Sequence, residues 1–254
     1  MALAGAGDMR AIAAHAHAQP RASNLLGGAV TALRGYRSEV EADRKQLTGT
    51  VRGEDGVHRC WWGDSPPEYR AYHDREWGFP VADDVRLFEK LSLEGFQSGL
   101  SWLTILRKRD AFRRAFAGFE FSAVARFDQR DVDRLLADAS IVRHRGKIEA
   151  VINNVRRALE LVEAEGSLAA FIWRFEPAPR AAGTDRSAVV AHTDESRALA
   201  RELKRRGWRF VGPTTVYAFM QAMGLVNDHL HGCGAWAEVE RARAEFARPR
   251  PTTT

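Results

Sequence analysis

The chain contains only two cysteines, and each is paired in the sequence with a histidine. Cys60 is followed by His73, and His229 is followed by Cys233 near the other end of the chain. Two thiolates and two neutral imidazoles satisfy tetrahedral Zn2+ and leave no position for water, as in structural zinc sites. The short spacing from His229 to Cys233 suits one turn of helix or a tight turn at Gly232. We therefore predict one structural zinc ion bound by these four side chains.

Two alternatives remain open for these residues. The thiols could lie near histidines by coincidence, because short metal patterns give false positives. His58 or His231 could also compete as ligands. A zinc hydrolase is disfavoured, because four protein ligands leave the metal no open position.

A second candidate is a carboxylate among aromatic residues. Glu94 falls on one helical face with Leu87 and Leu91, in a segment that runs to Ser101 and that Asp84 could cap. Burial of a carboxylate is costly, so Glu94 either accepts hydrogen bonds within the core or binds a ligand, and both readings remain open. Nearby aromatic rings would suit a flat, positively charged ligand. These rings belong to Trp62, Tyr69, Tyr72, Trp77 and Trp102.

A third candidate is the basic segment from Arg143 to Lys147, between two predicted helices. Gly146 permits a tight turn, the amides that open the next helix can bind a phosphate, and the basic side chains neutralise its neighbours. This pattern indicates a helix-hairpin-helix DNA clamp, although a solvated basic loop has the same composition. Ser98 and Ser101 suggest a serine nucleophile only superficially, because the segment lacks a G-x-S-x-G elbow.

Composition limits the classes of protein to which the chain can belong. A chain of 254 residues with 45% apolar residues can bury a sizeable core. Its net charge of +5 is compatible with a polyanionic partner without establishing one. Two distant cysteines form no disulfide framework, no apolar run is long enough to span a membrane, and charged residues interrupt any signal-like segment at the N-terminus. We expect a cytoplasmic protein with no membrane association.

Aromatic density rises abruptly at Cys60, which places a domain boundary near His58. We predict a flexible extension over 1–57, one domain over 58–240 and a tail over 241–254. Helical patterns run from Ile148 to Val162, from about Asp194 to Arg206, and onward from Pro213. Strand signals are scarce, so the predicted fold class is all-α.

Several longer blocks of the sequence resemble the 3-methyladenine DNA glycosylase I family. The blocks are Arg59-Cys60-x-Trp62, Tyr72-His73-Asp74-x-Glu76-Trp77-Gly78, Leu93-Glu94-Gly95-x-Gln97-x-Gly99-Leu100-Ser101-Trp102, Arg143-His144-Arg145-Gly146-Lys147-Ile148, and Phe210-Val211-Gly212 through Phe219-Met220-Gln221-Ala222 to Gly224-Leu225-Val226-Asn227-Asp228-His229. The resemblance spans about Arg59 to Trp236. It implies a helix-hairpin-helix glycosylase fold whose structural zinc joins the N- and C-terminal segments of the domain.

The resemblance also implies an activity, namely hydrolysis of the N-glycosidic bond of N3-methyladenine in double-stranded DNA during base-excision repair. The damaged base would flip into an aromatic pocket, with Glu94 as the catalytic carboxylate. The base-binding residues would be Trp62, Tyr69, Tyr72 and Trp102. The DNA-binding residues would be Arg143, Arg145, Gly146 and Lys147, with Gly99 and Leu100 as the wedge that replaces the flipped base.

Alkylation at N3 makes adenine cationic and weakens its glycosidic bond, so strong acid catalysis is not required. Lys147 lies at the hairpin, where phosphate contact is its plainest role, and we therefore predict a monofunctional enzyme, acting as a monomer. Two other functions remain open. One is a DNA-binding protein without catalysis, and the other is a glycosylase for another alkylated purine.

Overall fold

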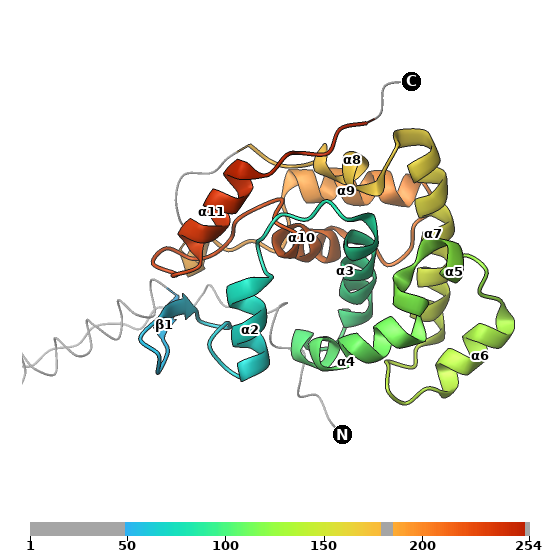
Figure 1. The fold of residues 1–254 in the computed structure, drawn as a ribbon, viewed down its shortest axis with the longest axis horizontal. Helices are drawn as coiled ribbons and strands as arrows, with labels where there is room; N and C mark the ends of the chain where they lie inside the picture. The colour runs from blue at the N-terminus through green and yellow to red at the C-terminus, as the bar shows by residue number, and fades with distance from the viewer. Residues whose placement is uncertain (1–48, 179–184, 252–254) are drawn as a thin grey trace, which may run out of the picture.

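The computed structural model describes residues 49–178 and 185–251, and this part of the chain is predominantly α-helical (Figure 1). Its helices are α2 (Pro67–Arg75), α3 (Asp84–Gln97), α4 (Trp102–Ala115), α5 (Phe121–Val124), α6 (Gln129–Ala137), α7 (Arg145–Glu165), α8 (Leu168–Trp173), α9 (Asp194–Arg205), α10 (Pro213–Ala222) and α11 (Trp236–Glu245). Two 3-10 helices, η2 (Ala117–Phe119) and η3 (Arg186–Ala188), lie in the connections. None of the described helices is long and apolar enough to cross a membrane.

A small antiparallel hairpin departs from the all-α prediction. Strand β1 (Thr50–Arg52) pairs with β2 (His58–Cys60), with Thr50 opposite Cys60. The boundary predicted near His58 therefore falls inside a paired element, and β1 belongs to the folded part of the chain. The predicted end at residue 240 likewise falls inside α11, which runs to Glu245. The rest of the predicted extension, residues 1–48, lies outside the described residues.

Helix α3 is the central helix of the fold. Every residue from Leu87 to Gln97 is buried, and the helix packs against α4, α7, α8 and α10. A helix buried on all sides requires its polar side chains to be paired. The partners of its charged residues Glu89, Lys90 and Glu94 are therefore informative about the site.

Local sequence signals set the ends of the two helices that carry the pocket. Asp83 accepts a hydrogen bond from the Arg86 amide at the start of α3, and Ser101, considered above as a nucleophile, accepts one from the Thr104 amide as the cap of α4. Between them Gly99 has a φ of +85°, which L side chains rarely adopt. The continuous helical face predicted as far as Ser101 is therefore divided by a turn.

The predicted helices in the second half of the chain are confirmed. The apolar run from Ile148 to Val162 lies within α7. Helix α9 begins at Asp194 and ends at Arg205, close to the predicted limits, and α10 begins at Pro213. These helices have strong local signals, since proline favours the first helical turn and glycine follows the last one.

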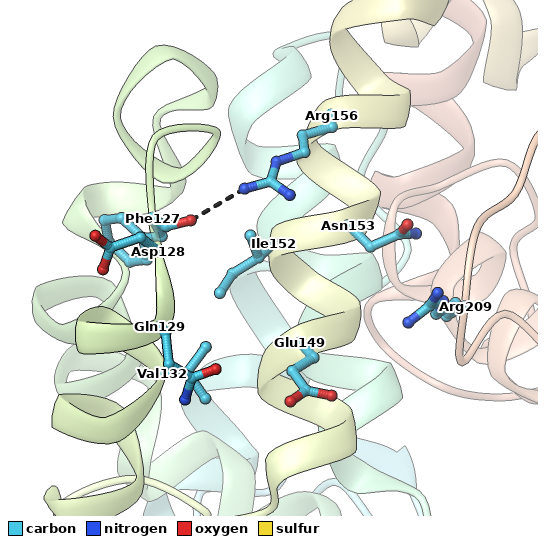
Figure 2. A pocket seen from close by; sticks show the side chains of 9 residues that line it. All are labelled: Phe127, Asp128, Gln129, Val132, Glu149, Ile152, Asn153, Arg156 and Arg209. Carbon is cyan, nitrogen blue, oxygen red and sulfur yellow. Dashed lines mark hydrogen bonds between the residues drawn. The ribbon is translucent and has the colours of Figure 1, made fainter.

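A hollow of about 350 Å³ lies between α6 and α7 (Figure 2). Its lining includes Asp128, Glu149 and Arg156, and the Arg156 guanidinium donates to the Phe127 carbonyl at 3.0 Å. No residue predicted for the zinc site, the base pocket or the DNA contact lines this hollow. It therefore lies outside the predicted site.

Candidate functional site

The predicted base-binding residues come from α2, α4 and the turn before α2 and form one aromatic cluster, beside which α3 places the predicted catalytic residue Glu94. The Tyr72 and Trp102 rings lie at a tilt with their centroids 5.4 Å apart. Trp62 extends the cluster, with its centroid 5.9 Å from that of Tyr69 and 6.4 Å from that of Tyr72. Glu94, Tyr72 and Trp102 are 3%, 3% and 1% exposed. The structure therefore brings the carboxylate and the aromatic rings together in the core.

Hydrogen bonds fix the walls of this cluster and leave one donor unused. The Leu103 amide donates to the Tyr69 hydroxyl at 3.0 Å, so α2 supplies an acceptor for the first turn of α4. Trp102 Nε1 is buried and has no acceptor among the described residues. A buried donor without an acceptor is costly, and this N–H is available to a ligand.

Lys90 was not among the predicted site residues, yet its ammonium lies at the centre of the cluster. Its Nζ atom is 2.7 Å from Glu94 Oε1, donates to the Tyr72 hydroxyl at 2.7 Å, and lies 3.3 Å from the centroid of the Trp102 ring. The available signal was the four-residue spacing of Lys90 and Glu94 on one helical face.

Burial shifts both charged groups of this pair toward neutrality. It raises the pKa of Glu94, although the ammonium of Lys90 opposes the rise. Burial also lowers the pKa of Lys90 to about 8, against the attraction of Glu94. Each group therefore depends on an opposite charge to remain ionised in the core.

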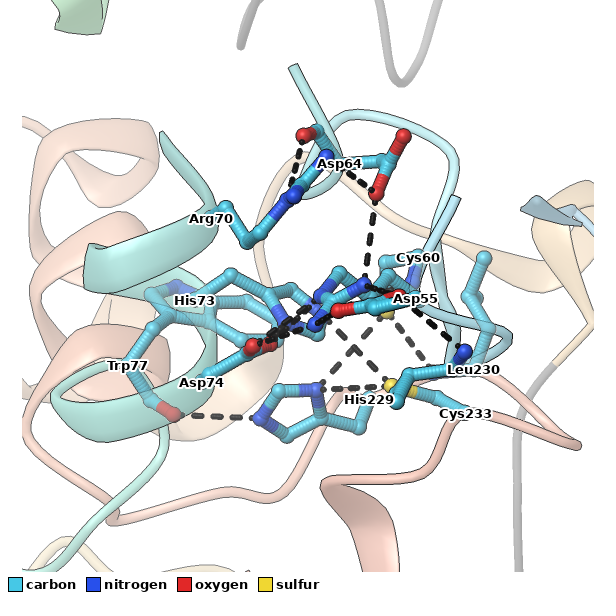
Figure 3. Close-up of polar contacts among 12 residues, drawn as sticks. Asp55, Cys60, Asp64, Arg70, His73, Asp74, Trp77, His229, Leu230 and Cys233 are labelled. Atoms are coloured by element: carbon cyan, nitrogen blue, oxygen red, sulfur yellow. Dashed lines mark hydrogen bonds and ion pairs between the residues drawn. The ribbon is translucent and has the colours of Figure 1, made fainter. Parts of the chain in front are cut away.

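The four predicted metal ligands converge at one buried point, shown in Figure 3. Their ligand atoms all lie within 4.8 Å of one another. The Cys233 sulfur is 3.4 Å from His229 Nδ1 and 3.5 Å from His73 Nε2, and the Cys60 sulfur is 3.8 Å from His229 Nδ1. Tetrahedral zinc, with bonds of about 2.3 Å to sulfur and about 2.0 Å to nitrogen, separates such ligands by about 3.6 Å. The donor set and its spacing therefore fit zinc.

Of the two backbone arrangements predicted for His229 and Cys233, the structure has the tight turn at Gly232. His229 and Cys233 are joined by a tight turn, in which the Cys233 amide donates to the Leu230 carbonyl at 2.9 Å and Gly232 has a φ of +83°. The alternative ligands His58 and His231 are exposed and lie outside the cluster. The arrangement joins β2 and α2 to the segment that precedes α11.

Groups behind the ligands orient them. His73 Nδ1 lies 2.8 Å from Asp74 Oδ1, and His229 Nε2 lies 3.1 Å from the Trp77 carbonyl, so the other nitrogen of each ring faces the cluster. The buried Arg59 donates to Asp74 at 2.8 Å. Burial raises the pKa of the Asp74 carboxyl, but hydrogen bonds from Arg59 and His73 outweigh this effect and lower it.

The pKa values of the two thiols shift in opposite directions. The Cys60 thiol donates to Cys233, and this bond, with the contacts of Cys233 to His229 and His73, lowers the pKa of Cys233. Burial raises the pKa of Cys60. Because the two thiols share one site, they titrate as a pair.

The predicted hairpin connects α6 to α7. His144 Nδ1 accepts a hydrogen bond from the Lys147 amide at 3.2 Å and so caps α7. Arg143 and Arg145 are exposed beside this cap. Arg145 lies 3.4 Å from each of the carboxylates of Asp133 and Glu149. The exposed guanidinium groups thus flank the start of a long helix, where an anion would bind favourably.

Lys147 differs from the other basic residues of this segment. Its side chain is buried, and Nζ donates to the Phe96 carbonyl at 2.8 Å and to the Ser98 carbonyl at 2.6 Å. These carbonyls lie at the C-terminal end of α3, where a positive charge is favourable. Its ammonium is therefore bonded inside the protein, which differs from the expectation of a phosphate contact.

The turn after α3 and one residue missed by the sequence analysis lie close to the hairpin. Leu100 is 37% exposed and follows Gly99 in this turn, which Lys147 bonds through Ser98. Phe210 is 40% exposed, has a φ of +55° and lies with its ring centroid 6.2 Å from that of His144. An exposed phenylalanine in a left-handed conformation is unusual, and the sequence carries no signal for that conformation.

Comparison with known proteins gives a consistent result. The sequence model of the family described as methyladenine glycosylase matches residues 61–237. DNA-3-methyladenine glycosylase 1 of Escherichia coli (strain K12) is 47% identical over 180 residues, which cover 70% of this chain and 96% of that protein. The DNA-3-methyladenine glycosylase of Haemophilus influenzae (strain ATCC 51907 / DSM 11121 / KW20 / Rd) is 43% identical over 178 residues, with coverages of 69% and 96%.

Solved structures agree with the sequence comparison. The 3-methyladenine DNA glycosylase I from Staphylococcus aureus, studied for its recognition of 3-methyladenine, superimposes with a TM-score of 0.67 at 38% identity. The match covers 70% of this chain and 96% of that chain. A variant 3-methyladenine DNA glycosylase I in complex with 3-methyladenine also has a TM-score of 0.67 at 38% identity, with coverages of 70% and 97%.

Proposed function

The chain belongs to the methyladenine glycosylase family and removes 3-methyladenine from DNA in base-excision repair, and we propose that Glu94, Tyr72 and Trp102 receive the damaged base. The observation that carries this assignment is a carboxylate, 3% exposed, enclosed with two aromatic rings whose centroids are 5.4 Å apart. We assign Trp62 and Tyr69 to the wall of the same pocket, since the Trp62 ring lies beside both Tyr69 and Tyr72.

The charge of the damaged base explains why such a pocket is useful. Adenine alkylated at N3 is cationic within DNA, so it stacks favourably on electron-rich rings and is balanced by a carboxylate. When the bond between N9 and the sugar C1′ breaks, its electron pair goes to the base, which leaves as a neutral molecule. Water then adds to C1′ and releases a proton. Glu94 therefore acts on the charge of the base, and the leaving group needs no proton.

The aromatic contacts alone discriminate too weakly against undamaged adenine. A desolvated cation–π contact is worth about 2 kcal/mol, which is roughly a thirtyfold preference. Normal adenines outnumber the lesion by far more than this. The Glu94 carboxylate and the weakness of the alkylated bond must therefore supply most of the discrimination.

We propose that the base reaches this pocket by flipping out of the duplex, which costs a few kcal/mol and least for a damaged base. The exposed turn at Gly99 and Leu100 is suited to replace the flipped base. Arg143, Arg145 and the amides near Gly146 are suited to bind the phosphate backbone in a helix-hairpin-helix contact. Lys147 is left out of this contact because its ammonium bonds carbonyls of the protein.

We propose that Cys60, His73, His229 and Cys233 bind one structural zinc ion, on the basis of the donor types and spacing described above. Zinc held by four protein ligands supplies a cross-link and no reactive water. The cross-link would hold β2 and α2, and with them Tyr69 and Tyr72, against the C-terminal segment of the domain.

We further propose that water, and not a lysine, attacks the sugar, so that the enzyme is monofunctional. A lysine nucleophile would form a Schiff base with the sugar and could be trapped covalently on DNA by borohydride. We expect no trapped adduct on alkylated duplex DNA. Formation of an adduct would overturn this part of the proposal.

The pocket is tested by release of 3-methyladenine from alkylated duplex DNA. We expect Glu94→Gln to reduce the single-turnover rate of release sharply while DNA binding and thermal unfolding remain close to wild type. Glu89→Gln is the matched control, because Glu89 lies on the same helix but is paired with Arg113. Equal rates in the two variants would reject Glu94 as the acting carboxylate. DNA binding without release by the wild type, or release of another alkylated purine, would support the alternative functions.

A further inference from the structure

The ammonium of Lys90 makes the contacts that a positively charged base would make. It lies 3.3 Å from the Trp102 ring centroid and 2.7 Å from a Glu94 oxygen, and Lys90 is only 5% exposed. These are the two interactions, a cation–π contact and an opposite charge, that the proposed pocket offers to the alkylated base. The free protein thus satisfies its own pocket with an internal cation.

The ammonium and a stacked base cannot occupy this place together. Nonbonded carbon atoms in contact are about 3.5–4.0 Å apart, so a ring lying on the same face of Trp102 needs the space that Nζ fills. A cationic base would also be repelled by an ammonium a few ångströms away in a site of low dielectric. Binding of the base on this face therefore requires Lys90 to leave.

We propose that Lys90 is a resident cation that competes with the base for the face of Trp102 and for Glu94. The proposal rests on the base pocket proposed above. Lys90 withdraws when the cationic base binds, and Glu94 exchanges one positive partner for another. After cleavage the base is neutral, so it no longer balances Glu94, and the returning ammonium displaces it. Lys90 is therefore a positioning and specificity residue that weakens the binding of the product.

The surroundings of Lys90 offer a second position for its charge. Glu76 is the other carboxylate that acts on Lys90. It is paired with Arg109, and its side chain is 37% exposed, so it lies toward solvent. The four-carbon stem of lysine is flexible and carries a compact charge. A rotation of the stem could therefore exchange the buried Glu94 for the more exposed Glu76.

The proposal is tested by calorimetric titration of the protein with free 3-methyladenine, the neutral product. We expect Lys90→Ala to bind it about thirtyfold more tightly than wild type, because the cation–π contact of the resident ammonium no longer competes. Lys90→Arg retains a competing cation and should bind no more tightly than wild type. Lys204→Ala is the matched control, because Lys204 is an exposed lysine of α9. Unchanged or weaker binding by a folded Lys90→Ala variant would overturn the proposal.

A second pair of variants covers the case in which Lys90→Ala fails to fold with Glu94 unpaired. Lys90→Ala combined with Glu94→Gln removes both charges of this pair, and it should bind 3-methyladenine more tightly than Lys90→Arg combined with Glu94→Gln, because arginine stays ionised without a partner. Equal affinities would again reject competition by Lys90. Trp102→Ala separates this failure from failure of the pocket itself. If wild type and Trp102→Ala bind the base equally well, the base does not stack on Trp102 and the pocket assignment is wrong.

Discussion

Replacement of Lys147 by methionine should destabilise the fold without removing a phosphate contact. The Lys147 ammonium donates to the carbonyls of Phe96 and Ser98 at 2.8 Å and 2.6 Å, where α3 ends. Methionine retains an unbranched apolar side chain of similar length but donates no hydrogen bond. The variant therefore leaves carbonyls in this region without their charged donor, which is costly in a buried place.

The magnitude follows from these contacts. Hydrogen bonds to charged groups are worth about 1.5–3 kcal/mol each, and a cation at the end of a helix adds roughly 0.3–1 kcal/mol. The ammonium loses hydration on burial, which offsets part of the sum. We expect a net loss of about 3 kcal/mol in the free energy of unfolding. With a urea dependence of about 3 kcal/mol/M, the midpoint should fall by about 1 M.

Urea unfolding and DNA binding at several salt concentrations together test this reasoning. Arg143→Met is the matched comparison, because Arg143 is exposed in the same hairpin. If Arg143 contacts a phosphate, its variant should keep the wild-type stability and lower the slope of log K against log salt by about 1. Lys147→Met should lose stability and keep the wild-type salt slope. A stable Lys147→Met variant with a lower salt slope would place Lys147 on the DNA and refute the argument.

Two further predictions concern the metal and pH. Metal analysis should find one zinc ion per wild-type chain. Cys233→Ser should lose this ion, whereas His231→Ala should keep it, because His231 is exposed and lies outside the cluster. Retention of zinc by Cys233→Ser would reject the ligand set. Burial lowers the pKa of Lys90 from 10.5 to about 8, so between these values the unfolded chain binds more protons and stability rises with pH. Urea unfolding at pH 8 and pH 9.5 should show this rise in wild type and not in Lys90→Met, and equal rises would contradict it.

The helices were predictable because their signals are local. The apolar period of α7 and the proline that opens α10 lie within the helices themselves. Strand β1 has only three residues, and its pairing with β2 depends on a partner across a turn. Three residues cannot display a period of two convincingly, so the sequence carried no usable strand signal.

The ligand types in the site were easier to predict than the directions of charged side chains. Cysteine and histidine are few in this chain and have strong metal preferences, so their positions identified the cluster that the structure contains. Lysine has many roles. Lys147 lies in a basic segment, but only the fold shows that its stem points inward to the end of α3.

Energetics also indicates that Lys90 is buried beside Glu94 for a reason other than stability. Both side chains are almost fully buried on the central helix. A buried ion pair loses so much hydration that well-packed apolar residues in its place are often neutral or stabilising by about 1–4 kcal/mol. Stability alone therefore gives little reason to place a lysine at this position. A pocket that must hold a carboxylate ready for a cation gives a better one, since the internal ammonium opposes the rise in the pKa of Glu94 until the base arrives.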